Sequence, residues 1–209
     1  MAYVGNWPSA PGFSAAGFKQ NTITKRTQTA SGRQIRISNA TMLWSGTLVF
    51  PTMNLAQFRP IQGFVALTQG TLNEFDIVIP IVSESQSVNA SALTATVNGA
   101  HSAGDTTINI STNLGGAGNA LKAGDVVRFA NHTKVYMCTT DINTDGSGNA
   151  VLNIQPALVE NLSNTESITT NNVPFRMILS NDVQEFGYRT DGLVSVSYTH
   201  LTLPTKRIV

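Results

Sequence analysis

Two neighbouring segments alternate apolar and polar residues with a period of two. Residues 34–38 place Ile35 and Ile37 on one face of an extended chain, with Arg36 on the other. Residues 41–50 place five more residues on one face, namely Met42, Trp44, Gly46, Leu48 and Phe50. Because successive side chains of a strand point to opposite faces, we predict antiparallel strands that pack one face on a core.

A helical period follows these strands. Asn54 suits an N-cap, Gln57 stands at the position of its capping-box partner, and Gly70 is a stop signal. The apolar residues that recur at helical spacing are Leu55, Phe58, Ile61, Phe64 and Val65. Pro60 lies beyond the first turn, so we expect it to kink or shorten the helix near Gln57.

Apolar strand signals return after the helix and again near the end of the chain. Residues 75–82 read F-D-I-V-I-P-I-V, where Pro80 favours an edge position or a strand end. From Val173 onward, apolar residues recur at every second position, and Asp191-Gly192 is a hairpin turn signal. These segments are typical of the same half-buried sheet.

The region between them differs in composition, because short apolar runs alternate with Gly-Asp, Gly-Gly, Asp-Gly and Ser-Gly turns. Two runs open alike, with Ala103-Gly104-Asp105 and Ala123-Gly124-Asp125 as tight turns that lead into strands. Five strands are expected, at 106–110, 125–129, 134–139, 151–154 and 167–170. Five strands suffice for a small β-barrel or sandwich.

The fold class predicted from these patterns is mainly β. We expect an antiparallel β-sandwich framework with one helix, interrupted by an inserted small β-barrel or sandwich module. The framework is discontinuous and comprises residues 1–84 and 173–197, whereas the module comprises residues 85–172. Insertion at an exposed loop with neighbouring ends is structurally easy.

The last residues, 198–209, break the preceding pattern and look like a translated sequencing adapter. We therefore expect a non-native tail and a final framework strand truncated near Val196. No function is assigned to the charged and histidine residues of this tail, His200, Lys206 and Arg207.

Composition excludes several classes of function. Charged residues make up 12% of the chain, the net charge is +1 and no Lys or Arg run exceeds two residues, so nucleic-acid binding is not expected. No apolar stretch reaches membrane-spanning length and no signal peptide is recognisable, so membrane insertion is not expected. The single cysteine, Cys138, is expected to be buried as a small hydrophobic residue.

One loop resembles the first half of a calcium-binding loop. Asp141, Asn143 and Asp145 alternate before Gly146, as in an EF-hand. Position twelve is Leu152 in place of a bidentate Glu, and Asp, Asn and Gly also suit a hairpin loop. We interpret the loop as a turn, keep the three residues as a weak metal candidate, and expect no cofactor.

No catalytic constellation is recognisable, because no histidine stands beside a nucleophile motif. Three carboxylates near the end of the framework invite comparison with a glycosidase acid pair, namely Asp182, Glu185 and Asp191. Acidic residues near turns usually face solvent, so we predict that the protein is not an enzyme. The residues chosen as possible ligand contacts on the module are Asn131, His132 and Tyr136, together with the loops near Asn143 to Asn149.

Four motifs identify a family resemblance: Ser31-Gly32-Arg33, Trp44, Phe50-Pro51 and Leu67-Thr68-Gln69-Gly70. With them, the framework resembles the N-terminal domain of distal tail proteins of long-tailed bacteriophages. The later segment S-N-D-V-Q-E-F-G-Y-R-T-D-G-L-V-S-V-S is similar to the closing hairpin of such proteins. The module, including A-G-D-V-V-R-F-A-N-H-T-K-V-Y-M-C, looks like small β domains that decorate phage structural proteins.

The resemblance implies a non-enzymatic subunit of the virion tail tip or baseplate, made in the cytoplasm of the bacterial host. Such a minor tail protein is expected to form a ring of six copies. Its expected neighbours are the tail tube and the hub or fibre proteins. The alternative is a carbohydrate- or receptor-binding module of a phage tail, with a host surface glycan as partner. Few charges and many hydroxyl and amide groups suit an interface, because such groups are cheaper to desolvate than charges.

Overall fold

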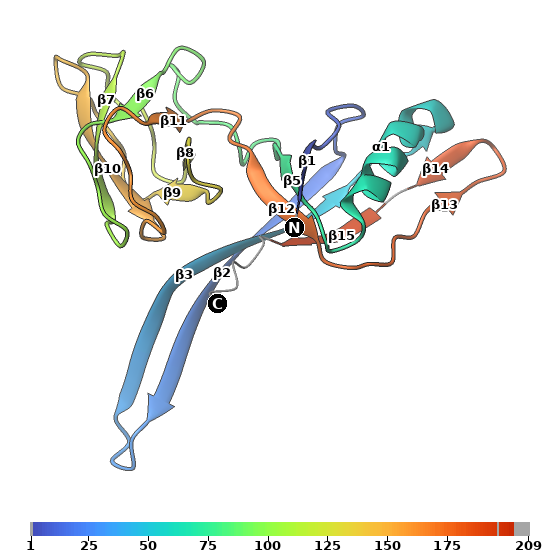
Figure 1. Cartoon of the computed structure of the whole chain (residues 1–209), viewed down its shortest axis with the longest axis horizontal. Helices are drawn as coiled ribbons and strands as arrows, with labels where there is room; N and C mark the ends of the chain where they lie inside the picture. The colour runs from blue at the N-terminus through green and yellow to red at the C-terminus, as the bar shows by residue number, and fades with distance from the viewer. Residues whose placement is uncertain (1, 196, 203–209) are drawn as a thin grey trace. The chain divides into compact units, whose positions relative to one another are not determined.

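The computed structural model describes residues 2–195 and 197–202 (Figure 1). It divides into two compact units. The first comprises Met1–Lys19, Trp44–Ser83 and Pro174–Val209, and the second comprises Gln20–Leu43 and Glu84–Val173. Strands dominate both units, and the described residues contain one helix, so the predicted mainly β fold class is confirmed.

A six-stranded sheet with the order β1-β5-β12-β15-β3-β2 forms the first unit and continues into the second. In that order, its strands are Tyr3–Asn6, Glu74–Ile77, Phe175–Leu179, Ser197–Thr202, Gln34–Val49 and Ala15–Gln28. β1 runs parallel to β5, whereas β12 and β15 pair antiparallel with their neighbours. β15 covers part of the tail expected to be non-native; Val196 and residues 203–209 lie outside the described residues.

The two alternating segments near the N-terminus form one continuous strand, β3. The five residues predicted to share a face are all buried, Met42, Trp44, Gly46, Leu48 and Phe50. Gly46 permits a close approach of β2, because a Cβ at this position would lie 3.2 Å from the carbonyl oxygen of Gly17. Trp44 also stacks on Phe18. The core face predicted for residues 42–50 is therefore confirmed, whereas the prediction that the two segments form separate antiparallel strands is wrong.

Helix α1 (Leu55–Thr68) begins and ends at the expected signals. The side chain of Asn54 accepts the Gln57 N–H, the Gln57 side chain accepts the Asn54 N–H, and Gln69 takes a left-handed conformation at the end. The expected shortening at Pro60 is wrong, since the helix continues through it. Pro60 is exposed, so water can reach the carbonyl that its missing N–H leaves without a helical partner.

A small sheet completes the first unit beside this helix. Its order is β13-β14-β4, with the bounds Gly187–Tyr188, Leu193–Ser195 and Met53–Asn54. Ring contacts attach the segment before β14 to the helix, because Phe58 packs edge-on against Phe186 and Tyr188. The strand expected over 75–82 is shorter than predicted, because β5 ends at Ile77 and Pro80 follows in a turn.

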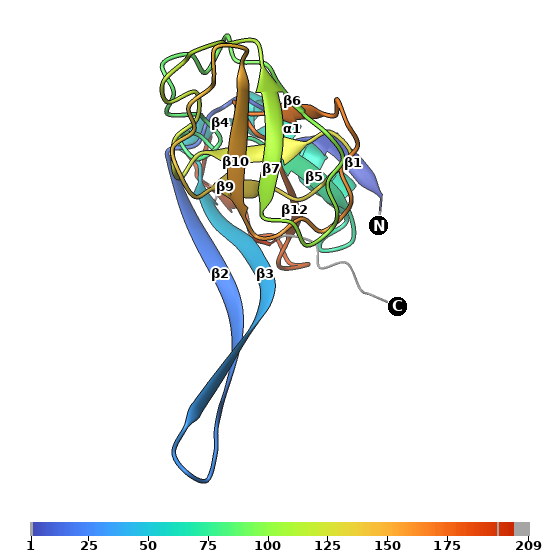
Figure 2. The same cartoon turned by 90° about the vertical axis from the view of Figure 1, so that its left-hand side faces the viewer.

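The module in the second unit is a closed barrel with the order β10-β7-β6-β11-β8-β9, in which β7 and β10 lie side by side (Figure 2). In chain order, its strands are β6 (Ala95–Val97), β7 (Thr107–Thr112), β8 (Val126–Phe129), β9 (Tyr136–Cys138), β10 (Asn149–Gln155) and β11 (Ser167–Thr169). The five expected strands are present, and β6 is an additional one. The barrel core includes Phe129, Tyr136 and Cys138, so the expected burial of the thiol is confirmed.

The two similar turns of the module have the same construction. Gly104 and Gly124 take positive φ values of 100° and 95°. Each is followed by an aspartate whose side chain accepts a backbone N–H from three residues earlier: Asp105 from Ser102, and Asp125 from Lys122. The shared Ala-Gly-Asp sequence thus sets the same capped turn before β7 and before β8.

Asp125 also binds the segment that begins the module, which Asp105 does not. Its side chain is 1% exposed and also accepts the Ser85 hydroxyl at 2.7 Å and the Gln86 N–H at 3.0 Å. Because a buried carboxylate needs such donors, these bonds attach the first residues of the module to its barrel. Ser85 is held further by Asn171, which accepts the Ser85 N–H.

We expect Asp125→Ala to destabilise the module by about 3 kcal/mol, because three donors lose a buried acceptor. Asp105→Ala, in the matched and partly exposed turn, should cost less than about 1 kcal/mol. The measurement is urea-dependent labelling of Cys138, whose buried thiol reports opening of the barrel. Equal effects of the two substitutions would contradict the additional role of Asp125.

Candidate functional site

Strands β2 and β3 form a two-stranded ribbon (Figure 1). Most side chains of β2 are exposed to solvent. β15 pairs with β3 only over residues 45–49, and every residue of β2 except Phe18 is exposed. A turn closes the ribbon. Its Thr29 N–H donates to the Arg33 carbonyl, the Arg33 N–H donates to the Thr29 hydroxyl, and Gly32 takes a φ of 82°. β2 is also an edge strand of the six-stranded sheet.

The ribbon combines positive charge with exposed isoleucines. Residues 1–73 contain no Asp or Glu, and five of their six cations lie on the ribbon, Lys19, Lys25, Arg26, Arg33 and Arg36. The exposed fractions of Ile23, Ile35 and Ile37 are 40%, 42% and 57%. The prediction that Ile35 and Ile37 face a core is therefore wrong. The net charge of +1 gives no sign of this basic surface. The absence of Asp and Glu before Glu74 does indicate it.

A second surface with apolar and charged groups lies on α1 and the segment 181–189. Asp182 accepts the backbone N–H and the hydroxyl of Thr71, and Gln62 donates to the Tyr188 hydroxyl. These bonds join the segment to the helix and its following turn. The most exposed apolar side chains are Leu67, Leu72, Val183 and Tyr188, all more than half exposed.

The three carboxylates compared with a glycosidase pair have separate partners. The two bonds from Thr71 lower the pKa of Asp182 below its ordinary value. Asp191 lies 3.2 Å from the Arg189 guanidinium and accepts the Leu193 N–H. Glu185 is exposed. Their arrangement is that of turn and surface residues, as the sequence predicts.

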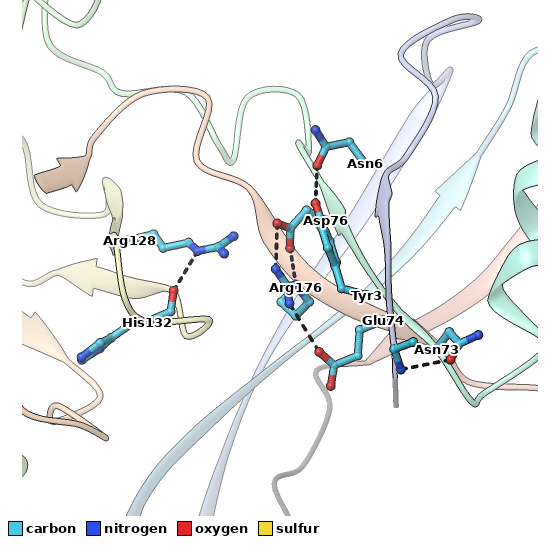
Figure 3. Close-up of polar contacts among 9 residues, drawn as sticks. Tyr3, Asn6, Asn73, Glu74, Asp76, Arg128, His132 and Arg176 are labelled. Carbon is cyan, nitrogen blue, oxygen red and sulfur yellow. Dashed lines mark hydrogen bonds and ion pairs between the residues drawn. The ribbon is translucent and has the colours of Figure 1, made fainter.

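A partly buried charge cluster joins three strands of the first unit (Figure 3). Arg176 on β12 makes a two-bond contact with Asp76 on β5, at 2.5 and 3.1 Å. Its guanidinium also lies 3.5 Å from Glu74 and 4.1 Å from the centre of the Tyr3 ring on β1. A bidentate pair of this kind fixes geometry, so the cluster holds β1, β5 and β12 together.

Two of the three residues chosen as possible ligand contacts belong to the barrel interior. His132 and Tyr136 are 1% and 0% exposed, and His132 Nδ1 lies 2.8 Å from the Tyr136 hydroxyl. The same hydroxyl accepts the Val159 N–H. Asn131 is exposed, and its backbone N–H donates to Glu166. Burial favours packing for His132 and Tyr136, and Asn131 stays a predicted contact.

Asp141, Asn143 and Asp145, the residues kept as a weak metal-binding candidate, accept backbone N–H groups from different parts of the module. Asp141 accepts the Ala123 N–H, Asn143 accepts the Asn119 N–H, and Asp145 accepts N–H groups of its own turn. The backbone N–H of Asn149 is the largest influence that lowers the pKa of Asp145. In the described part of the chain, no group of three His, Cys, Asp or Glu residues is placed to hold a metal ion.

An open concavity of about 280 Å³ lies beside this turn, on the outer face of β7 and β10. Its lining is rich in amides and comprises Asn98, Asn109, Asp145, Asn149, Ala150 and Val151. Asn98 donates to the Asn149 side chain, and Asn149 donates in turn to Asp145. Asp145 and Asn149 belong to the loops proposed from the sequence as ligand contacts. Asn98 and Asn109 had no such signal, because they come from distant positions and join the group only when the barrel closes.

Burial raises the pKa of Cys138 and of Tyr136 to about 12 each. Both groups are therefore neutral in the folded barrel while an unfolded chain ionises earlier. Their contribution to stability is complete below about pH 9, where the unfolded thiol begins to ionise, and is lost as the pH rises towards 12.

Lys134 acts in the opposite sense, because burial lowers its pKa to about 8 and the cost of burying its charge is relieved as the pH rises. We therefore expect the effect of the thiol as a difference between variants: from pH 8 to about 10.5, the unmodified module should lose on the order of 2 kcal/mol of unfolding free energy relative to Cys138→Ala, which retains Lys134. Urea unfolding followed by circular dichroism at both pH values measures this difference, even if the baseline stability of Cys138→Ala falls. Tyr188→Phe, which alters an exposed tyrosine, is the control, and an unchanged slope in Cys138→Ala would contradict the assignment.

None of the described residues forms a helix of the length and hydrophobicity needed to cross a membrane. Comparison with curated protein sequences finds no match. Residues 84–173 match the family model described as "Distal tail protein pb9, B domain". The matched segment contains the whole closed barrel and the Ser85–Asp125 bond that anchors it. The barrel is thus similar to the B domain of a phage distal tail protein, and this match over 90 of the 209 residues supports a structural role of the chain in a phage tail.

Proposed function

We propose that the protein is a non-enzymatic ring subunit of the phage tail tip, between the tail tube and hub or fibre proteins. The observation that carries this proposal is the ribbon, which exposes Ile23 on the edge strand β2 and Ile35 and Ile37 on β3. Such an edge offers backbone donors and acceptors to another chain. A single chain leaves this surface in water, and a neighbouring subunit would cover it.

Ring closure follows if the ribbon binds a different surface on the next copy. A head-to-tail interface of that kind generates a closed ring when its rotation divides a full turn, and we propose six subunits. In this arrangement, the framework of residues 1–84 and 173–197 supplies the ring and the module of residues 85–172 points outward. The tail tube and the hub or fibre proteins would contact the two faces of the ring.

We expect mass photometry at micromolar concentration to show particles of six times the 22.3 kDa chain mass. Ile35→Asp with Ile37→Asp should give monomers, because charge would replace the apolar contact of the ribbon. Val88→Asp, at a 92% exposed position of the module, is the matched control and should assemble normally. A strictly monomeric unmodified protein would count against the ring.

A second candidate function is recognition of a host surface glycan, and the amide-lined concavity on β7 and β10 favours it. Asparagine and aspartate side chains can exchange hydrogen bonds with sugar hydroxyl groups. Asn98 and Asn109 are exposed at this site, and Val151 adds an apolar contact. We place this function on the module as an addition to ring formation, with no catalysis.

A glycan array probed with the full chain should show binding that Asn98→Ala with Asn109→Ala abolishes. Asn131→Ala is the matched control, because Asn131 is exposed on the module but does not line the concavity. Loss of binding in Asn131→Ala alone would move the site to that residue. Binding to none of the glycans would remove the candidate function.

A further inference from the structure

Charge is segregated along this chain in a way that its net value conceals. All 12 acidic residues lie at or after Glu74, and the preceding 73 residues carry six cations. Five of these cations lie on the ribbon, and no carboxylate on either strand balances them. Like charges on one narrow ribbon repel, so its electrostatic energy falls when an acidic surface covers it.

The ribbon also specifies apolar contacts. Ile23, Ile35 and Ile37 are each at least 40% exposed, and Lys25 and Arg33 stand two positions from Ile23 and Ile35. A matching surface must therefore carry both carboxylates and large apolar side chains. Exposed apolar groups with neighbouring charges are typical of a surface that is covered in an assembly.

The surface formed by α1, its following turn and residues 181–189 meets both requirements. Leu67, Leu72 and Val183 are 58%, 52% and 81% exposed. Asp182 and Glu185 add two exposed carboxylates on the same segment as Val183. The Thr71–Asp182 bonds make the helix end and this segment one continuous surface.

We propose that the ribbon of one copy docks on this α1 surface of a second copy. Ion pairs between Arg33 or Lys25 and the carboxylates Asp182 and Glu185 would set the register, because Arg36 lies on the strand face opposite to Ile35 and Ile37. The isoleucines would cover Leu67 and Val183. The two surfaces differ, so the contact is head-to-tail and repeats from copy to copy. The inference rests on the proposed ring and names the pair of surfaces that builds it.

The module is the competing acidic partner within the chain. Glu84 to Val173 contains seven acidic residues and three cations, but its exposed valines, Val88, Val151 and Val159, lie on separate elements. Glu160 stands beside Val159 and is exposed. It provides a matched position at which to test whether the ribbon binds the module instead.

The test uses two charge-reversed full-length variants. The ribbon variant is Lys25→Glu with Arg33→Glu, and the α1 variant is Asp182→Asn with Glu185→Lys. Each alone should associate at least tenfold more weakly than the unmodified protein, because like charges then face each other across the interface. Melting temperatures close to that of the unmodified protein establish that both variants fold.

Mixing the two variants gives the decisive readout. The intact ribbon of the α1 variant can dock on the intact α1 surface of the ribbon variant. The reversed ribbon also meets the reversed α1 surface with opposite charge, so both contacts of an alternating ring regain attraction. Mass photometry should therefore show assemblies larger than a monomer only in the mixture. Rising NaCl concentration should weaken these assemblies, because salt screens exposed ion pairs.

Three outcomes separate the possibilities. Normal rings from the α1 variant, with loss of assembly in the ribbon variant, overturn the proposed surface pair but leave the ring intact. Loss of rings in Glu160→Lys, with normal rings from the α1 variant, assigns the ribbon to the module and also overturns the proposal. A monomeric unmodified protein rejects the ring itself, and with it the interface.

Discussion

The ladder between β5 and β12 is the constraint on which the framework depends. It pairs Arg176 with Asp76 across a separation of 100 residues, and the bidentate contact of these side chains fixes the same register as the backbone pairing. β12 pairs with β15, β15 pairs with β3, and β3 pairs with the ribbon strand β2. Closing a loop of this length costs only about 4 kcal/mol of chain entropy, since the cost grows with the logarithm of loop length. An independently closed barrel between the two strands reduces even that cost, because it holds its own ends in place.

The barrel shows how a chain with few charges uses them. Asp125, Asp105 and Asp145 each accept backbone N–H groups at a turn, and Asn143 and Asp141 do the same for neighbouring loops. The residues that suggest a calcium loop in the sequence therefore satisfy the module's own backbone. Alternating Asp and Asn with Gly is a pattern that ion binding and loop capping share, because both require oxygen acceptors around a tight turn. Hydrogen-bond donors elsewhere in the barrel decide between them, and these are not visible in the local sequence.

Local signals account for the elements that the sequence predicted well. The Asn54–Gln57 cap and the alternation from Met42 to Phe50 depend on neighbouring residues, so they could be identified without the fold. β6 could not, because its three residues become a strand only by pairing with β7 and β11. The burial of His132 was equally hidden, since it depends on how the loop between β8 and β9 turns its ring against Phe129 and Tyr136. The amide-lined concavity also requires closure of the barrel, whereas the acid-free N-terminal region is present in the sequence itself.

The cations of the ribbon connect stability with assembly. A two-stranded ribbon with exposed isoleucines is marginally stable in water and is prone to pair with any available edge. Lys25, Arg26, Arg33 and Arg36 oppose such pairing between two ribbons, because identical edges would bring like charges together. The same charges favour a surface with carboxylates, so one set of side chains discourages ribbon-to-ribbon aggregation and selects a different partner. Specificity then arises from the difference in free energy between ribbon-to-ribbon pairing and binding to a surface with carboxylates. The ribbon can therefore keep its exposed isoleucines for binding without pairing with any available strand edge.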